Sequence, residues 1–317
     1  MKESTCERKH LFVMKESAYT YSGQLFDMHC HPGFSSCAYE LLSQAADLGI
    51  SGFGNVVTPQ EYESIINQAE KLPYGFVLGA GLHPWWVENT GAFEETLQRA
   101  CTNAELSPFI GEVGLDGSER FAAAFSAQKE AFLALLKIIA KKEWAVLSIH
   151  SSKAASEVLD LLEKSGVFAE RATTWEAETV AFAQDISGGI SAYETKGETP
   201  AHKIAEKSSA QEIVVIFHWF NGSGEELKRA LDAGCYFSVN KRMLNTKRGR
   251  AYAIQIPEER LLLESDLPSS EDQAFSAFEW RRVLEETLEE LALLRKTDVL
   301  TLGNILEQTS KKILRIQ

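Results

Sequence analysis

Short apolar runs alternate with longer amphipathic stretches along most of this chain. Eight apolar runs, too short for helices, predict buried strands, and leucine and alanine at helical spacing follow them. The expected strands cover residues 25–31, 50–57, 75–82, 109–116, 145–150, 213–218, 235–239 and 261–266. The expected helices cover residues 38–48, 59–71, 92–104, 121–142, 154–164, 224–233, 246–254, 273–295 and 298–315.

The composition of the strands indicates how they pair. They are continuously apolar and no hairpin signal separates them, which is typical of parallel strands buried on both faces. Eight strand–helix units in regular alternation predict an α/β fold, a (β/α)8 TIM-type barrel. A doubly wound open sheet is the alternative, but eight regular units favour closure.

Two segments fall outside this alternation. Residues 1–22 are polar without clear periodicity, and we expect a loosely ordered extension. Residues 167–210 follow the fifth strand–helix unit and are rich in Glu, Ala and Thr, so we expect an insertion with structure of its own or a lid. Residues 23–317 are then expected to form a single barrel domain that carries this insertion.

Bulk properties narrow the class of protein. The chain has 317 residues, 44% of them hydrophobic and 24% charged, as in ordinary globular proteins. No run of about 18 apolar residues predicts a membrane span, and no apolar signal core opens the chain. Five cysteines without paired spacing suit a reducing compartment, so we expect a cytoplasmic location. The net charge of −13 argues against coating nucleic acid through bulk electrostatics, but not against engaging a strand locally.

The stretch Asp27-Met28-His29-Cys30-His31 carries the first chemical signal. Because side chains alternate along a strand, His29 and His31 share one face, where imidazoles about 6–7 Å apart can bind one metal ion. The alternative is two polar residues at a strand end, which is costly for side-by-side buried imidazoles without a partner. Asp27 is expected to position a neighbouring group.

Other side chains able to bind metal also stand at strand ends, and in a barrel all these ends meet at one rim. Four or five imidazoles with two carboxylates exceed the needs of one tetrahedral ion. They fit two divalent ions about 3.5–4 Å apart that share a bridging carboxylate and hydroxide. Zn, Mn, Fe or Co suits such mixed ligands, and Mg is a less natural match for histidine. These further side chains are His83, Glu112, His150, His218 and Asp266.

Six motifs, taken in order, resemble those of TatD-type metal-dependent deoxyribonucleases, which belong to the amidohydrolase-like metal barrels. The resemblance covers roughly residues 24–316 without the insertion. It implies a hydrolase of phosphodiester bonds, most of all a DNase or exonuclease using a metal-bridging hydroxide, with DNA as the first expected substrate. The motifs are His-x-His, Gly-Leu-His-Pro, Gly-Glu-Val-Gly-Leu-Asp, Ile-His-Ser, His-Trp-Phe-Asn-Gly-Ser and Leu-Leu-Leu-Glu-Ser-Asp-Leu-Pro.

The resemblance also implies how the metal ligands divide between two ions. His29 and His31 would bind the first ion. His150 and His218 would bind the second ion, and Glu112 would bridge both.

Asp266 would complete the ligands of the first ion and orient or deprotonate the attacking water. His83 resembles a substrate-facing donor to a phosphate oxygen, and with Glu112 these two residues form the expected catalytic set. The chain departs from the family at Gly117, where relatives usually carry an aromatic residue. It departs again at Ser152, where an arginine is common, which removes a phosphate clamp. These departures affect the substrate more than the chemistry.

A run of cations just after the seventh strand offers a compensation. On an acidic chain it forms a local patch that attracts anions, expected to bind substrate; an ordinary solvated helix start is the alternative. The expected substrate-binding residues are Lys241, Arg242, Lys247 and Arg248, with Arg250 as the fifth cation.

Three tryptophans, Trp85, Trp86 and Trp219, also lie beyond strand ends, where they could stack on nucleobases or line the rim as packing. Two rival functions stay open. The same metal centre could hydrolyse a non-nucleic ester, lactone or amide, because the ligands do not distinguish carbon from phosphorus. The chain could instead serve as a subunit of a larger defence or repair assembly, with residues 167–210 facing a protein partner.

Overall fold

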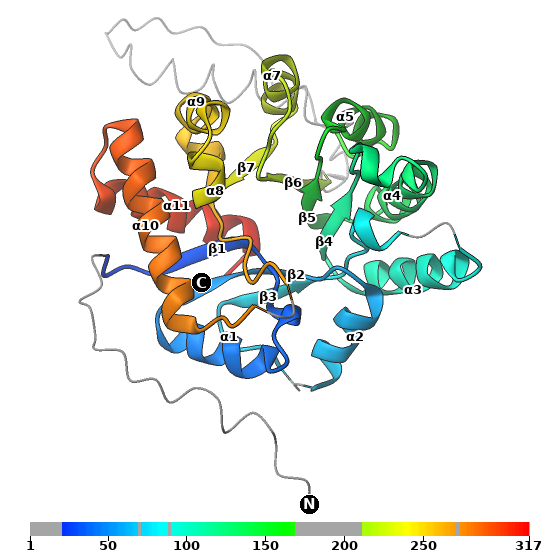
Figure 1. Cartoon of the computed structure of the whole chain (residues 1–317), viewed down its shortest axis with the longest axis horizontal. Coiled ribbons are helices and arrows are strands. Elements are labelled where there is room, and N and C mark those ends of the chain that lie inside the picture. The colour runs from blue at the N-terminus through cyan, green and yellow to red at the C-terminus, as the bar shows by residue number, and fades with distance from the viewer. Residues whose placement is uncertain (1–20, 69–70, 88–89, 169–210, 271–272, 317) are drawn as a thin grey trace, which may run out of the picture.

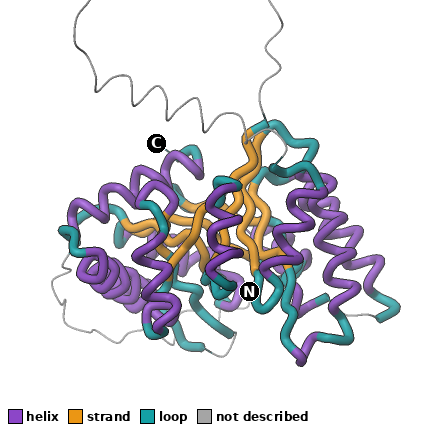
Figure 2. Tube along the Cα trace, turned by 90° about the horizontal axis from the view of Figure 1, so that it is seen from above, coloured by secondary structure: helices purple, strands orange, loops and turns teal. Residues whose placement is uncertain are grey.

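Eight parallel strands follow one another in chain order, and helices surround them (Figure 1). The computed structural model describes residues 21–68, 71–87, 90–168, 211–270 and 273–316. Seen from above, helices lie on both flanks of the strands (Figure 2). Within the described residues, no helix is long and apolar enough to cross a membrane.

Every expected strand and helix is present. The strands are β1 (Leu25–Cys30), β2 (Ile50–Asn55), β3 (Phe76–Gly79), β4 (Phe109–Gly114), β5 (Trp144–His150), β6 (Glu212–His218), β7 (Tyr236–Val239) and β8 (Leu261–Leu263). The helices are α1 (Ala38–Asp47), α2 (Pro59–Gln68), α3 (Phe93–Leu106), α4 (Phe125–Ile139), α5 (Ala155–Lys164), α7 (Gly224–Asp232), α8 (Lys241–Leu244), α9 (Lys247–Gln255), α10 (Ala277–Arg295) and α11 (Val299–Leu314).

Helix starts differ most from the expectation. The helix expected from residue 273 begins at Ala277, because the Ser276 side chain accepts a hydrogen bond from Glu279 N and caps α10 there. The helix expected over 121–142 is the shorter α4, and a separate 3₁₀ turn, Glu119–Phe121, precedes it. The helix expected over 246–254 is α9, and α8 is an additional short helix before it.

The strand ladders form two parallel sheets, in the orders β1-β2-β3 and β4-β5-β6-β7-β8. Backbone hydrogen bonds join the sheets at one seam, from Ala80 N to Phe109 O at 2.9 Å and from Gly111 N to Ala80 O at 3.2 Å. Strand order follows the chain without the reversal that defines a doubly wound sheet, as a (β/α)8 barrel requires.

The second seam lies between β1 and the residues after β8. Asp266 N donates to His29 O, and His31 N donates to Leu267 O, both at 2.9 Å. The joining residues lie beyond the ends of the short strands β3 and β8, so the regular ladder is interrupted at both seams. The second seam brings a predicted catalytic carboxylate directly beside the His-x-His pair.

An apolar layer underlies the polar strand ends. Val146 precedes His150 by four residues and Val214 precedes His218 by four, so each pair shares one strand face. Both valines belong to a buried hydrophobic cluster that also contains Ile313 of α11. The two histidines therefore lie directly above this buried hydrophobic cluster.

Two expected segments lie largely outside the described residues: 1–20 of the extension expected over 1–22, and 169–210 of the insertion expected over 167–210. Tyr21, at the end of the expected extension, is only 1% exposed, and its carbonyl accepts a hydrogen bond from Arg281 of α10. Tyr21 therefore packs with the barrel, although it falls in the segment expected to be loosely ordered.

Candidate metal centre

Glu112 of β4 lies at the centre of the polar cluster and is 1% exposed. Its two carboxylate oxygens face different histidines. Oε2 lies 3.2 Å from His29 Nε2 and 3.4 Å from His31 Nε2. Oε1 lies 2.8 Å from His150 Nδ1 and 2.9 Å from His218 Nε2. One carboxylate thus separates two pairs of imidazoles, which is the geometry expected of a ligand that bridges two ions.

The backbone around Glu112 is fixed from the neighbouring sheet. Glu112 N donates to Val56 O at 2.9 Å, and Val56 N donates to Gly111 O at 3.0 Å. A β-carbon at Gly81 would lie 2.5 Å from Glu112 N, so only glycine allows this close approach of the chains. These contacts place the Glu112 carboxylate at the seam between the sheets.

Asp266 and His83 complete the cluster on opposite sides of Glu112. Asp266 Oδ1 lies 3.4 Å from His31 Nε2 and 4.0 Å from His29 Nε2. His83 Nε2 lies 3.1 Å from Glu112 Oε1. The structure therefore brings the six predicted ligands and His83 together, although they come from six strands or strand ends.

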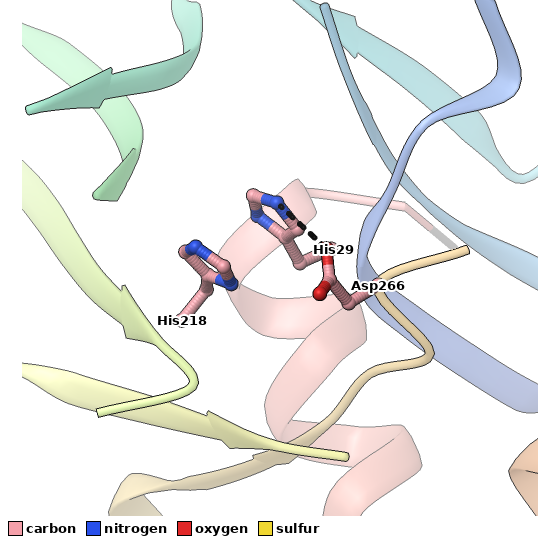
Figure 3. Close-up of side chains that lie close together, drawn as sticks. All are labelled: His29, His218 and Asp266. Carbon is pink, nitrogen blue, oxygen red and sulfur yellow. Dashed lines mark ion pairs between the residues drawn. The ribbon is translucent and has the colours of Figure 1, made fainter. Parts of the chain in front are cut away.

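Figure 3 shows His29, His218 and Asp266 turned towards one another, with the ion pair between His29 and Asp266. The rings of His29 and His218 stack with centroids 3.8 Å apart and planes inclined by 8°. His218 therefore lies within reach of both groups of ligands, whereas the family resemblance implies the second ion alone. The ligand atoms of His29, His218 and Asp266 lie within 4.8 Å of one another.

The second ring nitrogen of two predicted ligands faces an acceptor. His31 Nδ1 lies 3.1 Å from Asn55 O, and His150 Nε2 lies 3.1 Å from Asp116 Oδ2. With a metal ion bound to its other nitrogen, each ring would carry its proton on that side and donate it to this acceptor. His29 Nδ1 lies 2.6 Å from the Ser148 hydroxyl, which can accept in the same way.

His83 is held in the opposite manner. Its Nδ1 accepts a hydrogen bond from Trp85 N at 3.0 Å, so a neutral ring carries its proton on Nε2 and points a donor towards Glu112. Burial lowers the pKa of His83 to about 4, which favours this neutral form. The contact with Trp85 N favours a donor at Nε2, while the ligand atoms of His83, Glu112 and His150 also lie within 4.8 Å of one another, so the role of His83 as a donor stays a prediction.

Three buried carboxylates that the sequence did not mark as site residues lie beside the predicted ligands, and two of them hydrogen-bond to a ligand. Asp27, expected only to position a neighbour, accepts through Oδ1 from His29 N at 3.1 Å and from Ser265 N at 3.0 Å. Its Oδ2 accepts from Trp280 Nε1 at 2.6 Å. Asp27 thus ties the backbone of β1 to the residue preceding Asp266.

Each of the other two carboxylates lies next to one histidine. Asp116 orients His150, as above, whereas Glu264 Oε1 lies 3.8 Å from His218 Nδ1, beyond hydrogen-bond distance. Glu264 is fully buried and accepts from Asn240 Nδ2 at 2.6 Å. The sequence carried a signal for both carboxylates, because each stands just after an apolar strand. A buried acidic residue at such a position needs polar partners, which the neighbouring predicted ligands could provide.

The electrostatics of the cluster favour bound cations. Burial alone would raise the pKa of Glu112, but His83, His218 and His29 hold it well below its usual value. Burial also opposes ionisation of Asp266, yet His31 and its neighbours lower the pKa of that carboxyl. Against the effect of burial, the hydrogen bond to Asp266 raises the pKa of His31 to about 9, so without a metal this ring holds a proton that a divalent ion would displace. The ionised carboxylates and the deprotonated imidazoles would then form a nitrogen and oxygen donor set that fits divalent metal ions.

The predicted substrate-binding cations occupy different surroundings. Arg242 Nη1 lies 3.8 Å from Asp266 Oδ2, and its guanidinium lies 5.7 Å from the Trp219 ring centroid. Lys241 pairs with Glu286 of α10. Of these residues, Arg242 adjoins the metal cluster, whereas the charge of Lys241 is compensated.

Two further cations lie at the start of α9. Arg248 donates to Asn221 O at 2.9 Å, and Lys247 is exposed. Both residues are exposed, and Arg248 lies next to the loop that follows β6, which leaves both accessible to an anionic ligand.

Comparison with known proteins identifies relatives along nearly the whole chain. The sequence model described as TatD related DNase matches residues 26–315. The 3'-5' ssDNA/RNA exonuclease TatD of Musicola paradisiaca (strain Ech703) is 25% identical over 293 residues, 89% of this chain and 94% of that protein. Deoxyribonuclease TATDN3 of Homo sapiens is 24% identical over 265 residues, 77% of this chain and 78% of that protein.

Solved structures resemble the fold at lower sequence identity. YJJV, a TatD homologue from Escherichia coli K12, has a TM-score of 0.65 and 17% identity, covering 92% of this chain and 98% of that chain. A hydrolase of the TatD family from Entamoeba histolytica has a TM-score of 0.63 and 16% identity, with the same coverage. These likenesses confirm the predicted α/β barrel fold.

Proposed function

The chain belongs to the TatD related DNase family, and from this premise we propose that it is a divalent-metal-dependent phosphodiesterase acting on single-stranded nucleic acid. DNA is the first expected substrate, and removal of nucleotides from an end is the expected mode. The observation that carries the proposal is the division of imidazoles between the two oxygens of Glu112.

The donor set would hold two ions. When bound, such ions polarise a phosphoryl group and lower the pKa of water so that it can attack at neutral pH. The first ion would be held by His29, His31 and Asp266, the second by His150 and His218, and both by Glu112.

Two side chains would serve the reaction directly. Asp266, whose lowered pKa favours the ionised form, would accept a proton from the attacking water, because its Oδ1 faces the first group of ligands. His83 would donate its Nε2 proton to a phosphate oxygen, since Trp85 N occupies its Nδ1. Neither role requires a change in the protonation of Glu112.

Arg242 would contact the phosphate next to the scissile bond. Its guanidinium lies over Trp219 and within 3.8 Å of Asp266, so a bound phosphate can replace part of the interaction with that carboxylate. Lys247 and Arg248 would meet phosphates further along the strand. Lys241 has a smaller part in this proposal, because Glu286 already neutralises it.

Nuclease assays with a chelator control test the proposal. Purified protein is loaded separately with Mn²⁺, Zn²⁺ or Mg²⁺ and given oligonucleotides labelled at either end, both single- and double-stranded. We expect cleavage from one end of the single strand, its loss with chelator, and its return when metal is restored. A parallel assay with carboxylic esters, lactones and amides tests the rival function.

Cleavage that survives chelation would overturn the proposal, as would hydrolysis of a carboxylic ester in the absence of any phosphodiester cleavage. Glu112→Gln is the inactive reference. Glu94→Gln, a change at an exposed position of α3, controls for the loss of a glutamate charge elsewhere.

A further inference from the structure

A row of aromatic rings extends outward from the metal cluster over the segments that follow β3 and β4. The rings of Trp85 and Trp86 are nearly parallel, with centroids 6.3 Å apart and planes inclined by 18°. Trp85 also stacks with Phe121, at 5.6 Å and 17°. Trp85 is 46% exposed and Trp86 39%, although tryptophan is normally well buried. Three flat, nearly parallel rings therefore meet solvent beside the site.

The row is anchored to the metal cluster. Trp85 Nε1 donates to Asp116 Oδ2 at 2.7 Å, and the same carboxylate oxygen faces His150. Trp85 N donates to His83 Nδ1 at 3.0 Å. The ring of His83 meets those of Trp85 and Trp86 edge-on, at 5.1 Å and 5.3 Å. The orientation of the tryptophans is thus fixed by the residues proposed to act on the phosphate.

A cation accompanies the rings. The Arg120 guanidinium lies 5.0 Å from the Phe121 centroid and 5.9 Å from the Trp85 centroid. Arg120 is exposed and makes no ion pair with any described residue. Its charge remains available to an anion that approaches the rings.

We propose that Trp85, Trp86 and Phe121 form a stacking platform for a nucleobase of the bound strand, next to the scissile phosphate, with Arg120 against the adjoining phosphate. This inference rests on the proposed function and adds a base-binding subsite to it. Bases of a single strand present free π-faces, whereas those of a duplex are stacked inside it, so the platform selects single-stranded ends. The sequence showed the tryptophans but not their alignment with Phe121.

Binding of oligonucleotides that resist cleavage tests the platform. Metal-loaded protein is titrated with a fluorescent, phosphorothioate-linked single strand, and with versions that carry an abasic residue at the 5' or the 3' end. Because these versions have equal charge, only base contacts differ. We expect one abasic version to bind roughly 5- to 150-fold more weakly, the range of one base stacked on an aromatic side chain. Deoxyribose and ribose versions of each strand show which sugar the subsite accepts.

Trp86→Ala should bring the affinity for the intact strand down to that for the abasic strand, and Trp86→Phe should restore most of the difference. Leu106→Ala, at an 81% exposed apolar residue at the end of α3, is the matched control and should keep the wild-type difference. A Trp86→Ala variant that still distinguishes intact from abasic strands would overturn the platform. So would a wild-type protein that binds both equally.

These outcomes are separate from failure of the proposed function, which is judged by cleavage of ordinary phosphodiesters. Base-dependent binding without metal-dependent cleavage would contradict the proposed function and support the stacking platform. Metal-dependent cleavage without base-dependent binding would support the proposed function and contradict the stacking platform.

Discussion

The cluster around Glu112 and the rim above it are built in opposite ways. In the cluster, side chains project from strand ends. Neighbours such as Asn55 and Asp116 lie within hydrogen-bond distance of the histidine ring nitrogen that faces away from the metal site. On the rim, Arg242 and Arg120 project from a short helix and a turn and are exposed; Arg242 pairs with Asp266 at 3.8 Å, and Arg120 makes no ion pair with any described residue. The difference indicates that the barrel encodes the metal chemistry, whereas substrate choice depends on side chains that can change without moving a ligand.

Glu112→Gln is expected to have the largest effect on turnover. The change removes the negative charge between two groups of imidazoles but keeps the side-chain volume, so we expect turnover to fall by about a thousandfold or more. That loss exceeds the 10- to 100-fold expected of residues that only support a ligand. Initial rates and metal content by mass spectrometry measure it, and the unfolding midpoint shows whether the fold survives. A variant that keeps a tenth of the wild-type rate would contradict the bridging role.

Asp116→Ala tests the support of a single ligand. The orienting acceptor of His150 is lost, so we expect roughly 10- to 100-fold weaker binding of one ion and little change in the other. Calorimetric titration of the metal-free protein resolves the two sites.

Trp85→Phe is the matched control, because it removes the indole donor to Asp116 and leaves the hydrogen bond from His150 Nε2 to Asp116. It should bind both ions nearly as well as the wild type. Equal losses in the two variants would mean that Asp116 acts through the rim and not through His150.

The cluster was largely predictable and the rim was not, for a physical reason. Alternation along a strand and the common rim of a barrel place His29 and Glu112 together without any knowledge of distant contacts. The pairing of Lys241 with Glu286, 45 residues away, depends on how α8 packs against α10, which no local pattern reveals. The same limit hid Asp116, whose partner Trp85 lies 31 residues earlier.

The sequence also did not predict which nitrogen of a histidine ring faces a donor or an acceptor. The choice between ligand and donor for His83 depends on Trp85 N facing its Nδ1, a property of the turn at Pro84–Trp86. Helix starts could have been read more closely, because Ser276 with Glu279 three residues later is a recognisable N-cap signal.

Arg242→Gln probes the boundary between the two regions. It removes the guanidinium beside Asp266 and should raise KM for a single-stranded oligonucleotide about tenfold while kcat changes less, as for removal of a charge-assisted hydrogen bond. Steady-state kinetics with Arg242→Lys as the partial replacement measure the split. A fall in kcat alone would place Arg242 in the chemistry instead of in substrate binding.

Charge reversal of Lys247 and Arg248 should have the smallest effect of the four changes. Affinity should fall roughly fivefold at low salt, and the plot of log affinity against log salt should become less steep by about 1.4, roughly 0.7 for each single-strand phosphate no longer neutralised by a cation. Lys241→Gln is the control and should change neither quantity appreciably, because Glu286 already pairs with that lysine. An unchanged slope in the double variant would mean that Lys247 and Arg248 of α9 do not contact the substrate phosphates.

The most direct test of the bridging role of Glu112 is anomalous diffraction from crystals of the protein grown with Mn²⁺ or Zn²⁺. The arrangement of the imidazoles predicts two peaks about 3.5–4 Å apart, one beside Oε2 with His29 and His31, the other beside Oε1 with His150 and His218. A single peak, or two peaks not joined by the Glu112 carboxylate, would contradict it.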